Sequence, residues 1–114
     1  MSVMFVYVTA GDAAEAQQIG RTVIAEQLAA CANILPGVTS IFRWEGKVEE
    51  APEAMLILKT TEQKLERLIE RVKVLHSYEC PCIEALPVVE GNRDFLNWVV
   101  RETGGDPRHL LDPE

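Results

Sequence analysis

One stretch, residues 38–61, constrains the fold more than any other part of this 114-residue chain. Its first half is rich in β-branched and aromatic residues, Glu45 and Gly46 then interrupt the run, and residues 55–58 are apolar again. Two such runs around a short turn signal predict a long antiparallel hairpin. Each side exceeds the usual strand of about five or six residues, so the tip with Trp44 should overhang the core. An overhanging tip with a free strand edge needs a partner chain.

The hairpin is preceded by one predicted strand and one predicted helix. Residues 3–8 form an uninterrupted apolar run, which is typical of a central strand covered on both faces. Asp12 and Glu15 have the spacing of a capping box, and apolar residues then recur at helical intervals. A helix is therefore expected to run to about Leu28.

The hairpin is followed by a second helix, a further strand and a third helix. Thr60 and Gln63 form a second capping-box pattern, and an apolar stripe of helical period follows them. Residues 83–89 predict a strand whose end lies at a sheet edge or bulge, because proline removes a ladder donor. A short helix should open at residues 91–92, with Trp98 in the core.

The order is β-α-β-β-α-β followed by a helix. It predicts an α+β chain with a ferredoxin-like sandwich, a long hairpin between its second and third strands, and an additional C-terminal helix. One domain over residues 1–114 is expected, with about 106–114 as a loosely held tail. The sheet face without helices would be bare and apolar, so burial against copies in a closed ring is expected.

Charge and composition exclude several classes of function. The net charge of −7 argues against binding to nucleic acid and to anionic membrane surfaces. No apolar run approaches the roughly 20 residues needed to span a bilayer, and the N-terminal run lacks a positive n-region. We therefore expect a cytoplasmic protein. Its three cysteines are an odd number, which favours reduced thiols over a disulfide framework.

Several segments carry a family resemblance that covers nearly the whole chain. The matching segments are residues 28–33, 36–40, 44–47, 58–61, 86–88 and 95–98, with Tyr78 and Pro81 between them. In this order they resemble the CutA divalent-cation tolerance proteins.

The resemblance implies a ferredoxin-like subunit in a tight homotrimer, similar in architecture to the PII signalling proteins, and a loose link to copper and other divalent metals. The hairpin tips would contact neighbouring subunits through residues Trp44, Glu45, Gly46 and Lys47. The copper ligands proposed for that family correspond here to Val8, Leu75 and His76, of which only His76 has a metal-binding side chain.

Cys80-Pro81-Cys82 is the sharpest local candidate for chemistry. Two thiols one residue apart can both reach a soft ion such as Cu(I) or Zn(II), with His76 as a third ligand. The alternative is that one thiol packs as a small hydrophobe and the other is incidental. His76 at a helix end would then only complement the helix dipole.

Other candidate residues have equally open interpretations. Cys31 lies at a helix-to-strand junction where a nucleophile would fit, but no base stands at a recognisable offset, so a structural thiol is the alternative. Trp44 would either stack on a ligand or anchor a subunit contact. Glutamates of the hairpin would either line a cation-attracting rim or form a solvated edge; they are Glu45, Glu49, Glu50 and Glu53.

The expected function follows from these points. The chain contains no phosphate-binding loop, dinucleotide fingerprint or catalytic triad pattern, so we predict a protein that is not an enzyme. We expect a homotrimer linked to divalent metal (copper) tolerance, binding copper or another divalent cation weakly and with no obligatory cofactor. The alternatives are a PII-like module that binds a small ligand for signalling, or a trimeric interaction platform.

Overall fold

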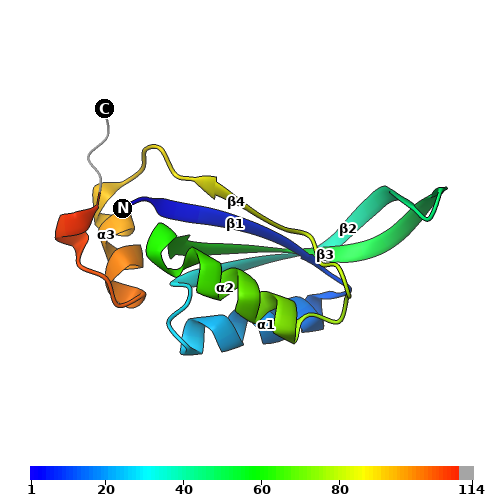
Figure 1. The fold of residues 1–114 in the computed structure, drawn as a ribbon, viewed down its shortest axis with the longest axis horizontal. Helices are drawn as coiled ribbons and strands as arrows, with labels where there is room; N and C mark the ends of the chain where they lie inside the picture. The colour runs from blue at the N-terminus through cyan, green and yellow to red at the C-terminus, as the bar shows by residue number, and fades with distance from the viewer. Residues whose placement is uncertain (111–114) are drawn as a thin grey trace.

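A computed structural model of the chain describes residues 1–110, in which helices cover one side of a four-stranded sheet (Figure 1). The elements are β1 (Val3–Ala10), α1 (Ala13–Ala25), β2 (Cys31–Trp44), β3 (Lys47–Thr61), α2 (Glu62–Leu75), β4 (Ile83–Pro87), α3 (Arg93–Glu102) and a 3-10 helix at Pro107–His109. All paired strands are antiparallel, in the order β2-β3-β1-β4. The predicted α+β, ferredoxin-like arrangement with an added helix is confirmed.

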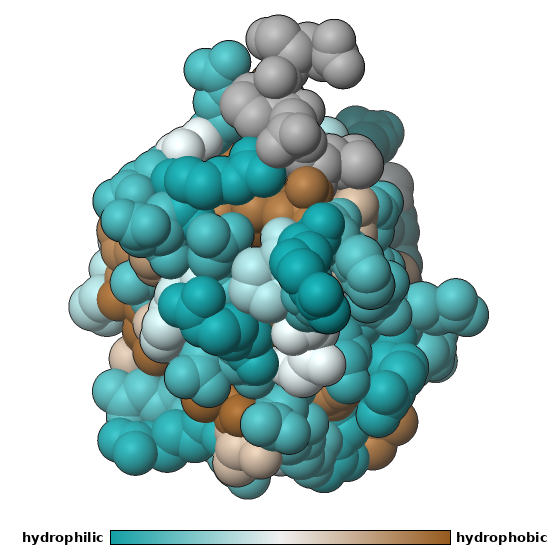
Figure 2. Space-filling model, turned by 90° about the vertical axis from the view of Figure 1, so that its left-hand side faces the viewer, coloured by the Kyte–Doolittle hydropathy of each residue, from teal (hydrophilic) through white to brown (hydrophobic). Residues whose placement is uncertain are grey.

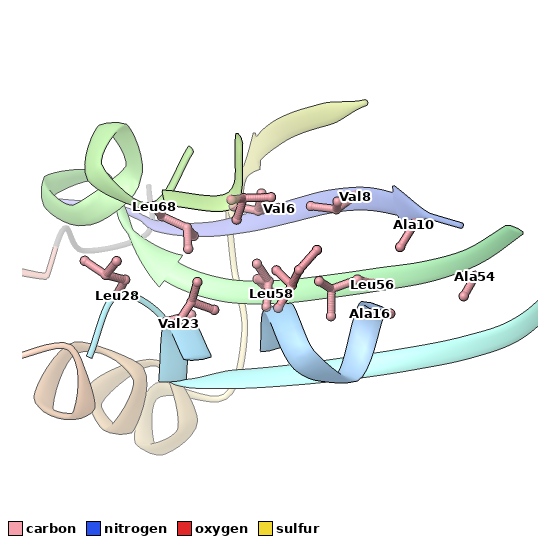
Figure 3. Packing of buried hydrophobic residues seen from close by; sticks show 13 residues of the cluster. Val6, Val8, Ala10, Ala16, Val23, Leu28, Ala54, Leu56, Leu58 and Leu68 are labelled. Carbon is pink, nitrogen blue, oxygen red and sulfur yellow. The ribbon is translucent and has the colours of Figure 1, made fainter. Parts of the chain in front are cut away.

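The main core lies between the sheet and the two helices α1 and α2. Alternate side chains of β1 and β3 point toward the helices (Figure 3), and Val6, Val8, Leu56 and Leu58 are fully buried there. The opposite side chains of β1, such as Tyr7, are only half-buried. Within one chain the helices cover only one face of β1, so the cover expected on its other face stays a prediction.

Helix starts follow local capping chemistry, with one exception. The Oδ1 atom of Asp12 accepts a hydrogen bond from the backbone N–H of Glu15 at 2.8 Å, which confirms the predicted start of α1. The second predicted capping box is wrong: the N-cap of α2 is Thr61, and its side chain makes no capping bond. Thr60 lies in β3, where its buried hydroxyl donates to the carbonyl of Leu28 at 2.7 Å.

The C-terminal elements match the prediction in position but differ in detail. The start of α3 is confirmed, since Asn92 caps it. β4 ends at Pro87 and lies at the sheet edge, as expected, although it is shorter than predicted. Trp98 is 36% exposed, so its assignment to the core is wrong; the buried residues of α3 are Leu96, Val99 and Val100.

Residues near both chain ends form a second apolar cluster. Val3, Ala30 and Leu110 pack there with the buried side of α3. The backbone N–H of His109 donates to the carbonyl of Asp106, closing the short 3-10 helix. Within the described residues, the segment that we expected to be a loose tail is thus partly packed, and residues 111–114 lie outside the description.

The predicted overlong hairpin is confirmed, and its outer part overhangs the core. β1 pairs with β3 only up to Ala54, so residues 47–53 of β3 pair with β2 alone. We call residues 38–53 the arm; seven strand residues extend roughly 24 Å. The radius of gyration is 14.9 Å, above the roughly 13 Å expected for a compact domain of this length. The arm extends past all other elements (Figure 1).

Among residues 1–110, no helix has both the length and the apolar character that crossing a membrane would require.

Candidate functional site

The sheet face turned away from α1 and α2 is apolar and largely uncovered. We call it the open face, formed by alternate residues of the four strands: apolar Phe5, Tyr7, Leu35, Met55, Ile57 and Leu86, together with Cys31, Asn33, Lys59 and Glu84. Leu35 is 46% exposed and Leu86 is 60% exposed. An apolar sheet face of this kind is typical of a contact surface between proteins.

The arm carries further exposed hydrophobic side chains. Trp44 is 54% exposed at the tip, and Ile41, Phe42 and Val48 are also exposed along both of its faces. The opposite end of the molecule differs: Figure 2 looks onto the α3 end and shows a mainly hydrophilic surface with scattered hydrophobic side chains. Exposed hydrophobic side chains also lie outside the sheet, among them Val74 of α2 and Val89 after β4, but those of the arm and the open face belong to one sheet.

Beyond the C-terminus of α2, His76 has a fully buried side chain with a partner at each ring nitrogen. Its Nε2 lies 2.7 Å from the backbone carbonyl oxygen of Thr9. Its Nδ1 accepts a hydrogen bond from the backbone N–H of Tyr78 at 3.0 Å. A carbonyl oxygen only accepts and a backbone N–H only donates, so the ring is the neutral tautomer with its hydrogen on Nε2. Neither nitrogen is free to bind a metal in this arrangement.

Glu15 joins α1 to the segment after α2. Its two carboxylate oxygens accept backbone N–H bonds from Gly11 at 2.9 Å and from Ser77 at 2.7 Å, and it lies 3.8 Å from the Nδ1 of His76. Burial alone would raise the pKa of Glu15, but the hydrogen bonds from Ser77 and Gly11 outweigh it and lower the pKa. The carboxylate is thus a structural tie held in its ionised form.

Glu15→Gln is expected to destabilise the protein by about 1–3 kcal/mol at pH 7, because an amide offers one acceptor oxygen to two backbone donors. Since the folded pKa is lowered, the contribution of Glu15 is present above its unfolded pKa and is lost as pH falls through the folded value. Urea unfolding of both proteins between pH 7 and pH 3 measures this. The difference between them should shrink in acid; a constant difference would contradict the assignment.

Tyr78 connects the same segment to the arm. Its hydroxyl donates to the Oε2 of Glu53 at 2.8 Å, and Glu53 is the last residue of the arm. Partial burial and the hydrogen bond to Glu53 raise the pKa of Tyr78 to about 12. The phenol therefore stays a hydrogen-bond donor at any physiological pH.

The two thiols of the Cys-Pro-Cys sequence lie on the surface. Cys80 and Cys82 are both exposed and free. The Sγ of Cys82 lies 3.5 Å from the Oε1 of Glu84, and partial burial of the sulfur together with this carboxylate raises the pKa of the Cys82 thiol. His76 lies nearby in sequence, but its ring is buried.

Cys31 faces the open side of β2, opposite Lys59 of β3. Partial burial raises the pKa of its thiol, against a smaller lowering by the charge of Lys59. The ammonium group of Lys59 donates to the Oδ1 of Asn33 and lies 5.9 Å from the centre of the Phe5 ring. A protonated thiol is a weak nucleophile.

Across the described part of the chain, no three histidine, cysteine or acidic residues form a group that could hold a metal ion. His76, Cys80 and Cys82 are therefore not brought together as a three-residue site. The sequence pattern also missed the network of Glu15, Glu53 and Tyr78. Of these residues, only Glu15 stood out in the sequence for a structural role, as a capping-box residue. That pattern does not predict the hydrogen bond from the backbone N–H of Ser77 to Glu15.

A groove of about 560 Å³ runs between α1 and the free edge of β2. Its lining includes Gly20, Ala32 and Ile34, with Gln17 and Arg21 as the polar lining residues. It combines apolar walls with a guanidinium group, which is a common composition for binding sites.

Comparison with known proteins settles the family. The model of the CutA1 divalent ion tolerance protein family matches residues 4–102. The chain belongs to this family. The resemblance found in the sequence is confirmed, and it extends to curated CutA relatives and to solved CutA1 structures.

Two curated relatives bear the name divalent-cation tolerance protein CutA. The one from Thermus thermophilus is 51% identical over 89 residues, which cover 78% of this chain and 86% of the relative. The one from Archaeoglobus fulgidus is 43% identical over 95 residues, covering 83% and 92%. Among solved structures, the divalent cation tolerance protein Cut A1 from Thermus thermophilus has a TM-score of 0.87 at 46% identity, covering 90% of this chain and 99% of that one. CutA1 from Oryza sativa also has a TM-score of 0.87, at 40% identity, covering 90% and 94%.

Proposed function

We propose that this CutA1 family member is a cytoplasmic homotrimer that takes part in divalent-cation tolerance, with copper as its metal. The observation that carries the proposal is the apolar surface shared by the open face and the arm. The names of the relatives support the tolerance role, and the family resemblance supplies the number of subunits.

The arm supports assembly because a two-stranded ribbon is marginally stable in water by itself. Trp44, Phe42 and Val48 are exposed on it without a core beneath them. A contact between the arm of one copy and a different surface of the next is heterologous, and such contacts form a ring when the rotation between copies closes, which the proposed trimer requires. The tip residues Trp44, Glu45, Gly46 and Lys47 then lie at the subunit contacts.

For the metal, we place the ligands at Cys80 and Cys82. Both thiols are exposed and one residue apart, and thiolate ligands suit Cu(I). His76 would join them only by giving up its hydrogen bond with Tyr78. Two ligands on a surface segment suit weak, reversible binding, and no obligatory cofactor is proposed.

A non-enzymatic role accords with the thiol chemistry. Partial burial raises the pKa of the Cys31 thiol, so this thiol is protonated near neutral pH and reacts slowly. A cytoplasmic location accords with three free thiols, which reducing compartments preserve. Fractionation of cells expressing the full chain tests the location, and export would overturn it. A solved relative from Archaeoglobus fulgidus is described as periplasmic.

The groove beside α1 favours a second candidate function, a PII-like module that binds a small ligand. Arg21 provides a cation beside the apolar side chains of Ile24 and Ile34, so the matching ligand would be a small anion with an apolar part. A thermal-shift screen with such compounds tests this, since a ligand of the folded state raises the melting temperature. Loss of the shift in Arg21→Ala would place the ligand in the groove.

The metal assignment predicts that the reduced protein withdraws Cu(I) from a chromogenic chelator. The double substitution Cys80→Ser/Cys82→Ser should abolish this competition, because hydroxyl groups are poor ligands for a soft ion. Cys31→Ser is the matched control and should behave like the wild type. Identical titration curves for all three proteins would remove the Cys-Pro-Cys site.

A further inference from the structure

The β2–β3 ladder changes register once, where the arm leaves the sheet. Leu35 pairs with Met55, and the next paired residue of β2, Val38, pairs with Glu53. β2 thus advances three residues while β3 advances two. Pro36 and Gly37 together face a single residue of β3, which is a β-bulge.

The turn at the tip sets the register of the arm. Glu45 and Gly46 form a two-residue connection between the paired residues Trp44 and Lys47. Their φ angles, 49° and 80°, are both positive, as in a type I′ turn, whose twist matches that of the flanking strands. Continuing the Leu35–Met55 register without the bulge would leave a three-residue loop. The register of the sheet and the register that the turn sets therefore differ by one residue. The bulge accommodates this additional residue of β2.

The bulge also decides which side of the arm is aromatic. With it, Phe42 pairs with Glu49 and lies on the same side of the ribbon as Leu35 on the open face. In the uninterrupted register, Phe42 would pair with Val48 and point to the side of α1 and α2, because side chains alternate. The bulge thus makes the open face and the Phe42 side of the arm one continuous surface.

The same feature controls the direction of the arm. A bulge bends its strand and increases the local twist, and Figure 1 shows the arm curving away from the line of the sheet. Gly37 has a φ angle of +78°, and a Cβ atom added there would have no atom within 4 Å. The backbone conformation at this position, and not a lack of space for a side chain, therefore favours glycine.

We propose that the bulge at Pro36 and Gly37 is the positioning element of assembly, which aims the arm and its aromatic side at a second copy of this chain. This inference rests on the proposed trimer. A second copy is the occupant because the open face continues directly into the Phe42 side of the arm. Each copy therefore presents both the open face and the exposed aromatic side chains of the arm, Phe42 and Trp44.

Deletion of Gly37 tests the proposal. It leaves Val38–Glu53 and all outer pairs, the type I′ turn and the side of Phe42 unchanged, and removes only the bulge. The distance between the arm and α2 is measured by pulsed electron double resonance, with labels at Glu50→Cys and Arg67→Cys in a chain whose native cysteines are serine. Labelled chains are diluted into unlabelled ones. The assembly is measured by sedimentation over a range of concentrations.

The deletion should shift the label distance and weaken association by about tenfold or more, since a misplaced interface anchor is worth at least that factor. Gly37→Asn is the matched control, because asparagine tolerates positive φ and keeps the residue count; both measurements should match the wild type. An unchanged distance or unchanged association in the deletion variant would overturn the role of the bulge. A monomeric wild type would refute the proposed trimer instead, and the label distance would still show whether the bulge aims the arm.

Discussion

Trp44→Ala should convert the proposed trimer into monomers at micromolar concentration. Trp44 is 54% exposed at the end of an arm that has no core beneath it. Buried aromatic anchors typically contribute about 2 kcal/mol or more to an interface, and a ring of three repeats the contact three times. The summed loss of about 6 kcal/mol corresponds to a factor of about 10⁴ in the dissociation constant of the trimer.

Light scattering coupled to size exclusion, repeated over a roughly hundredfold dilution, measures the effect. Glu66→Ala is the control, because Glu66 is an exposed residue of α2 that lies outside the arm. The monomers released from Trp44→Ala should keep their helical content, because the arm lies outside the core. Unchanged mass at every dilution would remove Trp44 as an anchor.

His76→Ala should lower the free energy of unfolding by about 2–4 kcal/mol and leave Cu(I) binding unchanged. The side chain is fully buried and satisfies the carbonyl of Thr9 and the backbone N–H of Tyr78. Each group left without a partner costs about 1–3 kcal/mol, less where water can enter the cavity. The prediction separates a structural histidine from a metal ligand.

Urea unfolding measures the stability of the His76 variant, and chelator competition measures its Cu(I) binding. His109→Ala serves as the control, because His109 is the other histidine and its side chain is exposed. Should His76→Ala keep full stability and lose its competition for Cu(I), the ring would be a ligand and the hydrogen-bonded arrangement would not describe its role.

Several sequence predictions failed for one physical reason: a local pattern does not report the partner of a side chain. Thr60 and Gln63 have capping-box spacing, yet Thr60 is drawn into β3, where the carbonyl of Leu28 accepts its hydroxyl. Trp98 is apolar enough for a core, but Val99 and Val100 occupy the buried side of α3.

Alternation of apolar residues, the turn at Glu45 and Gly46, and the cap at Asp12 were sufficient to predict the order of elements, the overlong hairpin and the exposed sheet face. These features depend on neighbours within a few residues, whose geometry the chain carries locally. The bulge at Gly37 arises only when the sheet register meets the turn register. The ties of Glu15 to Ser77 and of Tyr78 to Glu53 join residues far apart in sequence. They exist because packing of α1 and α2 on the sheet brings those residues together, and no local pattern records that packing.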